Sequence, residues 1–266
     1  MDGHFSSVAN VYREIRTTDP EPVYYIRDAL AGRDAVLAAD IGCGAGRYDK
    51  LLFEHVPNLH LTCIDASAQM IEQLTNHLAE ADIRNFVAKV SSVADWPVSE
   101  RSLDAVMTFN AVHHFAFPTF LGKAGHALRD DGRMFIYTRT PEQNAGSIWG
   151  RHFPRFTEKE SRLYSIEQME RWVTDRSDLK IVEVKRFRYA RRSSLKRLLS
   201  QARGRHYSTF ALYDAHEFEA ACRTFEERIC HTFDDLEDIS WHDENTLLHV
   251  TVADRENEAA PSRRQR

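Results

Sequence analysis

The sequence predicts an α/β fold, in which a doubly wound and mostly parallel sheet carries helices on both faces. Short apolar stretches of strand length alternate with stretches of helical periodicity up to about residue 139. The first strand, Ala35–Ala39, runs into a turn with three glycines at alternate positions, and a helical pattern follows over 48–53. A strand, a glycine turn and a helix in this order bring the backbone of such a sheet close to a nucleotide ligand.

The later elements continue this alternation. A helix is expected after Ser67, whose hydroxyl suits an N-cap, because its apolar residues recur at helical spacing. A turn at 128–133 precedes the fifth strand, a loop begins at Thr140, and Ser165 caps a helix over 165–173. Further strands are expected at His60–Asp65, Asn85–Val90, Ser102–Asn110, Met134–Tyr137, Leu179–Val184 and Thr246–Val252.

The spacing of the glycine turn, D-I-G-C-G-A-G over 40–46, distinguishes between two classes of ligand that such a turn can bind. A dinucleotide fingerprint, G-x-G-x-x-G, would need a third glycine at position 47, which holds Arg47. Asp40, before the turn, would repel a pyrophosphate but suits a ligand that carries an ammonium group. The spacing therefore disfavours a nicotinamide-dependent oxidoreductase.

This D-x-G-x-G-x-G run resembles motif I of the class I S-adenosylmethionine-dependent methyltransferases. The resemblance implies a Rossmann-like, seven-stranded sheet, mostly parallel with one antiparallel strand, the last in the chain. It implies S-adenosyl-L-methionine as the cofactor and S-adenosyl-L-homocysteine as its product. It also implies that Gly42, Gly44 and Gly46 line the methionine part of the cofactor and that Asp40 faces its amino group.

Two further segments resemble the same family. The run D-A-S-A-Q-M-I over 65–71 is similar to D-x-S-x-x-M-[LI], which implies that Asp65 accepts from the ribose hydroxyls and that Met70 packs near the adenine. Ser92 stands where the family has an aspartate for the adenine amino group, so Asp95 is an alternative acceptor. Asn110 ends the fourth strand on the ligand side of the sheet. Ala66 and Val93, beside these positions, are also expected at the cofactor.

The N-terminus resembles the pattern F-x-x-x-A-x-x-Y-x-x-x-R, which begins at Phe5. The resemblance implies that Tyr12 and Arg16 close over the cofactor, and the guanidinium of Arg16 suits a carboxylate. The alternative is an amphipathic helix with solvated basic groups, and the sequence leaves both open.

His113 and His114, just after the fourth strand, are the candidate catalytic residues. Methyl transfer is an in-line displacement at a sulfonium, so the protein chiefly aligns the nucleophile, the methyl group and the sulfur. A nucleophile that holds a proton at neutral pH also needs a base, and imidazole titrates in that range. In many members of the family such histidines only shape the pocket, and a carboxylate acceptor would need no base.

The chain divides into five segments. An N-terminal helical cap is expected over 1–33, a cofactor-binding core over 34–188 and a helical lid over 189–245. The last core strand follows over 246–254, and a tail over 255–266 is expected to be disordered because it is charged and lacks apolar periodicity. The loop after strand five overhangs the pocket, so it should supply substrate contacts. The candidates there are Arg139, Gln143, Asn144 and Trp149.

A basic run over 185–205 precedes an acidic stretch that begins at Asp214. This asymmetry has three possible explanations. The two segments could be helices that pair opposite charges, the basic run could bind an anionic substrate, or it could form a nucleic-acid surface. A formal net charge of −5 and the few aromatic residues in the run argue against nucleic acid. The sequence therefore favours a methyltransferase that acts on a small-molecule acceptor. A tRNA or rRNA methyltransferase and a non-catalytic cofactor-binding module remain as alternatives.

The composition of the 266 residues sets the outer limits. The four cysteines show no C-x-x-C spacing, which predicts neither a metal site nor a disulfide framework. No apolar run is long enough to span a bilayer, and the polar start Met1–His4 does not resemble a signal peptide. We therefore expect a cytoplasmic protein without a membrane partner, and the sequence does not predict its oligomeric state.

Overall fold

The structure is a computed structural model and describes residues 18–253. Its seven-stranded sheet has the order β3-β2-β1-β4-β5-β7-β6. β7 is antiparallel to both of its neighbours, whereas the pairs among β1 to β5 are parallel. This confirms the predicted sheet with one antiparallel strand. The strands are β1 (Val36–Ile41), β2 (Leu59–Asp65), β3 (Phe86–Val90), β4 (Leu103–Phe109), β5 (Leu128–Thr138), β6 (Leu179–Ser193) and β7 (Ile239–Val252).

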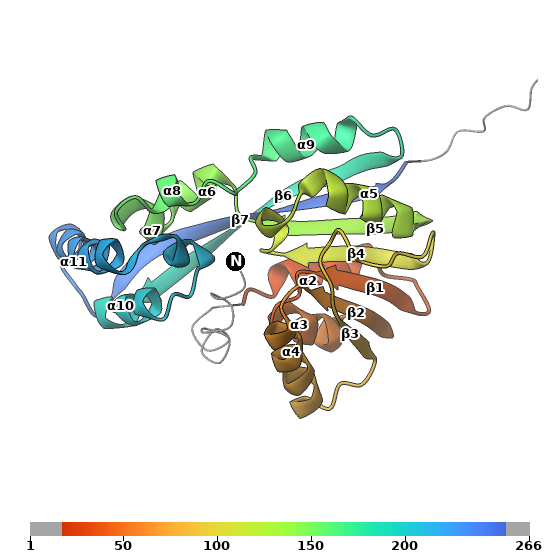
Figure 1. Ribbon diagram of the computed structural model, residues 1–266, viewed down its shortest axis with the longest axis horizontal. Helices are drawn as coiled ribbons and strands as arrows, with labels where there is room; N and C mark the ends of the chain where they lie inside the picture. Colours follow the sequence, from red (N-terminus) through yellow and green to blue (C-terminus); the bar gives the residue numbers. More distant parts are fainter. Residues whose placement is uncertain (1–17, 254–266) are drawn as a thin grey trace, which may run out of the picture.

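Helices cover both faces of this sheet (Figure 1). On one face, α2 (Glu21–Ala29), α3 (Arg47–His55) and α4 (Ala68–Glu80) bury apolar side chains against β1 and β2. On the other face, α5 (Phe117–Ala127) and α9 (Ile166–Thr174) pack over β4 and β5. The helix after β2 begins as predicted, because the hydroxyl of Ser67 accepts from the backbone N–H of Met70. The two buried layers hold the carboxyl ends of β1, β2 and β4 in fixed positions.

A helical cap lies beyond the carboxyl end of β5, at the left of Figure 1. Its apolar cluster is separate from those of the sheet and is centred on buried rings such as Phe153, Phe210 and Phe225. The cap consists of α6 (Pro141–Gly146), α7 (Ile148–His152), α8 (Phe156–Lys159), α10 (Leu195–Arg203), the 3-10 turn η2 (Ser208–Leu212) and α11 (Ala215–Thr232).

The predicted boundaries of the lid need correction. β6 continues to Ser193 and β7 begins at Ile239, so the expected borders at 188/189 and 245/246 fall inside two paired strands. The helices over 141–159, which we assigned to the core, belong to the cap instead. The strands extend this far because each covers the unpaired edge of the other and one end of the ribbon packs on the cap.

Two local predictions were also wrong. The turn expected at 128–133 lies within β5, where the pairing steps from Leu103↔Leu128 to Ala105↔Arg133 and leaves the residues between as a bulge. The loop expected from Thr140 forms two short helices. Thr140 and Gln143 make a capping box, and a proline in the first turn favours helix.

Within residues 18–253, no ion pair joins the basic run to the acidic helix that follows it. The arginines of the run that lie on β6 meet acids of β7 and its approach instead: Arg188 faces Glu244, and Arg192 pairs with Asp238. The charge asymmetry therefore stabilises a two-stranded ribbon rather than a helix pair. No helix between residues 18 and 253 is long and apolar enough to cross a membrane.

Candidate active site

A cavity of about 250 Å³ opens at the carboxyl ends of β1, β2 and β4. We call it the glycine-turn cavity. The predicted cofactor residues that line it are Asp40, Gly42, Gly44, Asp65, Ala66, Met70, Ser92, Val93 and Asn110. The parallel sheet explains this gathering, since successive strands end at one edge. Tyr12 and Arg16, the two cofactor candidates near the N-terminus, lie outside the described residues.

Asp40, at the end of β1, carries an unsatisfied oxygen into this region. Its side chain is 1% exposed, and Oδ1 has no hydrogen-bond partner within residues 18–253. Burial raises the pKa of this carboxyl well above its usual value, and the nearby carboxylates of Asp49 and Asp65 raise it further. An ammonium group placed against Oδ1 would supply both a donor and a compensating charge.

The three glycines of the turn have different surroundings. Gly44 has a φ of +55°, and a Cβ built on it would meet no atom within 4 Å. It is therefore the glycine that presents bare backbone to the cavity. A Cβ on Gly42 would lie 2.5 Å from Cβ of Ala111. Gly46 is the N-cap of α3, packs against Leu74 and does not line the cavity, contrary to our expectation.

Asp65 is held by the backbone on two sides. The N–H of Gly44 donates to its Oδ2, and the N–H of Ser67 donates to its Oδ1, both at 2.9 Å. Each carboxylate oxygen still has a lone pair available, so the side chain could accept from a diol as well. The same contacts fix the geometry of the glycine turn relative to β2.

Ser92 and Asp95 form a closed local pair. The hydroxyl of Ser92 donates to Oδ2 of Asp95 at 2.6 Å, and the N–H of Asp95 donates back to it at 3.1 Å. Ser92 lines the glycine-turn cavity, whereas Asp95 is exposed and does not. The carboxylate expected at this position is thus present as a neighbour of the serine.

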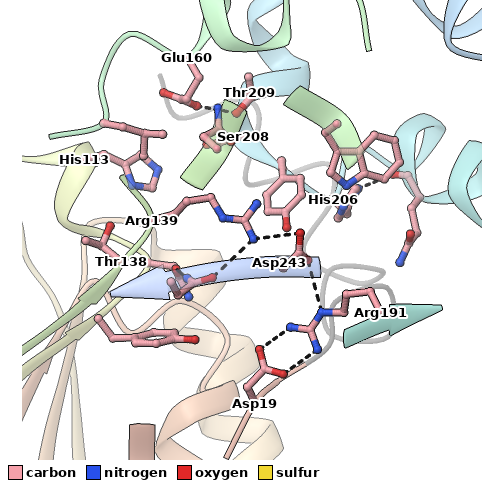
Figure 2. A pocket seen from close by; sticks show the side chains of 18 of the residues that line it. Asp19, His113, Thr138, Arg139, Glu160, Arg191, His206, Ser208, Thr209 and Asp243 are labelled. Atoms are coloured by element: carbon pink, nitrogen blue, oxygen red, sulfur yellow. Dashed lines mark hydrogen bonds and ion pairs between the residues drawn. The ribbon is translucent and has the colours of Figure 1, made fainter. Parts of the chain in front are cut away.

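A second cavity, of about 340 Å³, shares lining residues with the first one, and Figure 2 shows side chains that line this second cavity. We call it the arginine cavity, because Arg47, Arg139, Arg191, Arg192 and Arg197 are among its lining residues. Arg47, Tyr48 and Asn110 line both cavities and mark the junction. At this junction Oδ1 of Asn110 accepts from Nδ2 of Asn245 at 3.0 Å.

The two candidate histidines are divided between the cavities. Both lie in the 3-10 turn η1 (Val112–His114), with ring centroids 4.1 Å apart. His113 lines the arginine cavity, whereas His114 lines the glycine-turn cavity. His113 is therefore the one that faces whatever occupies the arginine cavity.

Three of the four predicted substrate residues line the arginine cavity: Arg139, Asn144 and Trp149. Gln143 does not, because its side chain is engaged elsewhere. Its Oε1 accepts from the N–H of Thr140, and its Nε2 donates to Oγ1 of Thr246 at 2.8 Å. It joins α6 to β7, and we drop it from the substrate candidates.

Sequence reasoning missed the polar residues that β7 supplies. Trp241, Asp243 and Asn245 alternate along the strand and all point into the arginine cavity. Asp243 lies between Arg139 and Arg191 (Figure 2). The segment W-H-D-E-N has only one apolar residue and so no alternating strand signal, and we expected it to belong to the helical lid.

A second missed group forms the side of the cavity that lies toward the cap, which we call the roof. Glu160 accepts from Arg162 through both oxygens, at 2.8 and 2.6 Å, and from Thr209 at 2.5 Å. Arg162 also donates to Oγ of Ser208 at 3.0 Å. Figure 2 shows Glu160, Ser208 and Thr209 together, across the cavity from Asp243. Only the fold brings these two segments together.

Comparisons with known proteins agree with this geometry. The sequence model of the family described as Methyltransferase domain matches residues 38–132. A malonyl-[acyl-carrier protein] O-methyltransferase of Herminiimonas arsenicoxydans is 27% identical over 197 residues, which cover 66% of this chain and 71% of that protein. A tRNA (carboxymethyluridine(34)-5-O)-methyltransferase of Macaca fascicularis is 29% identical over 145 residues, 53% of this chain and 19% of that protein. The chain thus spans about half the length, or less, of many curated relatives.

Solved structures share the fold. A methyltransferase of an antibiotic biosynthesis pathway of Anabaena variabilis superposes with a TM-score of 0.65 at 17% identity, over 88% of this chain and 98% of that one. The YcgJ protein of a Bacillus gives 0.62 at 15% identity, with the same two coverages. Residues 38–132 are therefore a methyltransferase domain, and the chain has the fold of S-adenosylmethionine-dependent methyltransferases.

Proposed function

We propose that this chain transfers a methyl group from S-adenosylmethionine to a small-molecule acceptor. The observation that carries the proposal is the junction of the two cavities at Tyr48 and Asn110. One cavity has the side-chain-free turn and the buried acid that suit the cofactor. The other cavity is lined by charged and aromatic groups that suit a polar acceptor.

The residues of the glycine-turn cavity fit the cofactor. Asp40 Oδ1 is a buried acceptor with no hydrogen-bond partner in the described part of the chain, which suits the aminoacyl ammonium, and the backbone of Gly44 leaves room beside it. Asp65 would receive the ribose hydroxyls, while Met70 and Ser92 line the part expected to hold the adenine. When bound, S-adenosylmethionine supplies an electrophilic methyl group on a sulfonium, which leaves as the neutral thioether.

The protein's part in the reaction is alignment and proton removal. The arginine cavity would hold the acceptor with its nucleophile at the junction, facing the methyl group. As the lone pair of that nucleophile forms the new bond to carbon, the carbon–sulfur pair passes to sulfur. A proton on the nucleophile would pass to the imidazole of His113. His114, on the other side of the turn, would shape the cofactor cavity.

The ion pairs of the basic run favour a small-molecule acceptor over RNA. Arg188, Arg191 and Arg192 of the basic run are each paired with a carboxylate, which leaves less charge for phosphates. The relative whose name gives a tRNA substrate matches this chain over only 19% of its own length.

Isothermal titration calorimetry with S-adenosylhomocysteine, followed by incubation of a metabolite extract with methyl-labelled S-adenosylmethionine, tests the proposal. We expect binding and a labelled acceptor of small mass. Gly44→Val should abolish binding, because the side chain fills the ligand's place at a positive φ. Gly146→Val, also with open space around its Cβ but in α6, should bind as the wild type does. Binding of a nicotinamide cofactor instead, or binding without any labelled product, would contradict the proposal.

A further inference from the structure

We propose that the acceptor is an organic acid whose anionic group docks on Arg139, and that the methylated atom is a different group of the same molecule, held near His113. The inference rests on the proposed function and specifies its substrate class. It also predicts that the product keeps the negative charge of the substrate.

The arginines of the cavity differ in how far their donors are used. Arg191 is held by two carboxylates, because Nη1 and Nη2 contact the two oxygens of Asp19 at 2.8 and 2.6 Å and Nε contacts Asp243 at 3.3 Å. It joins β6 to the chain before α2 and to β7. Arg192 pairs with Asp238 in an exposed position. Neither pattern is that of an arginine kept for a ligand.

The contacts that Arg139 makes with β7 are long. Its Nη2 lies 3.6 Å from Oδ1 of Asp243 and 3.5 Å from Oδ1 of Asn245, and its guanidinium lies 5.7 Å from the centroid of the Tyr207 ring. The side chain is only 11% exposed. A guanidinium has five N–H donors, and the two contacts with Asp243 and Asn245 involve Nη2 alone and are long for hydrogen bonds. A carboxylate or phosphate oxygen pair would meet the remaining donors in a bidentate geometry.

The roof of the cavity adds a donor and excludes a competing interpretation. Glu160 is buried and its charge is already compensated by Arg162, so it does not offer an unpaired carboxylate to a cationic acceptor. The Oγ of Ser208 accepts from Arg162, which leaves the hydroxyl hydrogen of Ser208 to be donated into the cavity. Glu160 and Arg162 thus act as positioning residues for a donor that suits an oxyanion.

The position of Arg139 separates the anionic group from the reacting atom. Arg139 follows β5, and its contacts Asp243 and Asn245 lie on β7, whereas the junction with the glycine-turn cavity lies at Asn110, at the end of β4. Neighbouring strands are about 5 Å apart, so the docking point and the junction are roughly 5–10 Å apart. One small molecule could span this distance.

The chemistry leads to the same separation. An oxygen whose lone pairs and charge are engaged by a guanidinium is a poor nucleophile. The docked anionic group therefore binds and orients the acceptor but is not itself methylated. The nucleophile is then a hydroxyl, amine or carbon of the same molecule. Its proton goes to His113, the new bond forms to the methyl carbon, and the electrons of the broken bond remain on sulfur.

Fractionation of the acceptor pool tests the inference. A metabolite extract is split on an anion-exchange resin, and both fractions are incubated with the protein and methyl-labelled S-adenosylmethionine. We expect the label in the retained fraction, in a product that still binds the resin and survives mild alkali. Label in the unretained fraction, or a neutral product that alkali hydrolyses as a methyl ester, would overturn the inference while the proposed function stands. Absence of label from both fractions would overturn both.

Substitutions locate the docking point. Arg139→Gln should reduce labelling of the retained fraction by about tenfold or more, as expected for a lost charged hydrogen bond, and Arg139→Lys should reduce it less. The affinity for S-adenosylhomocysteine should not change, which shows that the fold is intact. Arg188→Gln is the control, because Arg188 is an arginine of β6 that lies outside the arginine cavity and is 65% exposed. Labelling by Arg139→Gln equal to that by Arg188→Gln would contradict the assignment.

Discussion

At the scale of single residues, the proposed function depends on the buried carboxyl of Asp40, whose Oδ1 has no hydrogen-bond partner among residues 18–253. A buried polar atom without a partner is costly, so its position at the end of β1 fits a ligand that would donate to it. Asp49, below the turn, is equally buried and also has one oxygen without a described partner, but its Oδ1 accepts from the thiol of Cys63 at 3.1 Å and it does not line the cavity. The position beside the cavity is therefore what distinguishes Asp40 from Asp49.

Asp40→Asn should weaken binding of S-adenosylmethionine by about 1–3 kcal/mol, since the ammonium loses a charged acceptor. Calorimetry measures this directly. Asp49→Asn is the matched control and should change the affinity much less. Equal affinities for the Asp40→Asn variant and the wild type would remove the role assigned to Asp40.

At the scale of elements, short helices place the residues of the arginine cavity. α6 begins with a capping box formed by Thr140 and Gln143, and it carries Asn144 into the cavity wall. α9, on the sheet, begins with a similar box formed by Ser165 and Gln168. The capping box of α6 lies beside the arginine cavity. Ser165 and Gln168, which form the capping box of α9, line neither cavity.

Thr140→Ala and Ser165→Ala should each cost about 1 kcal/mol of unfolding free energy, the usual value of an N-cap side chain. Urea denaturation measures both. Only Thr140→Ala should also raise the KM for the acceptor, because α6 holds Asn144. A KM raised equally in both variants would show that the effect is general destabilisation.

β7 contributes a buried histidine that makes stability depend on pH. Burial and the charge of Arg133 lower the pKa of His249 from its ordinary value of 6.5 to about 4, and Nε2 lies 3.3 Å from the Arg133 guanidinium. Between pH 6.5 and about pH 4, the imidazole of His249 is mostly protonated in the unfolded chain but mostly neutral in the folded chain. Stability from this group is therefore present at pH 7 and is lost as the pH falls through that window.

His249→Gln should flatten the loss of stability between pH 6.5 and pH 4, because the neutral amide does not titrate. Thermal unfolding across this range compares the variant with the wild type. An unchanged slope in the variant would mean that other groups cause the acid sensitivity.

At the scale of the whole molecule, three apolar clusters divide the structure into a two-faced sheet and a cap. Phe210 is fully buried in the cap cluster, with ring centroids 5.0 Å from Phe153 and 5.2 Å from Phe156. None of the three lies in the clusters that support β1 and β4. Damage to the cap core should therefore act first on the acceptor side.

Phe210→Ala should remove about 3–5 kcal/mol of local stability, as for other large-to-small core changes. Hydrogen exchange read by mass spectrometry should show faster exchange in α10 and α11, with β1 and β4 still protected. Equal acceleration in all four elements would indicate that the cap and the sheet unfold as one unit.

The sequence predicted the sheet and the glycine-turn cavity because their signals are local. Asp40, Gly44 and Asp65 fall within one strand–turn–helix–strand segment, so spacing alone brings them together. It did not predict the arginine cavity in full. Asp19, Glu160 and Asp243 are far apart in the chain and meet only when β6 and β7 extend beyond the sheet. That extension depends on strand pairing, which hydrophobic periodicity does not encode.

Methyl transfer as proposed here requires that a cofactor in the glycine-turn cavity presents its methyl group to the arginine cavity. A crystal structure with bound S-adenosylhomocysteine tests this most directly. The account predicts the ligand's ammonium within hydrogen-bond distance of Asp40 Oδ1, its ribose at Asp65 and its sulfur directed toward Asn110 and the arginine cavity. A nucleoside bound elsewhere, or a sulfur turned away from that cavity, would contradict it.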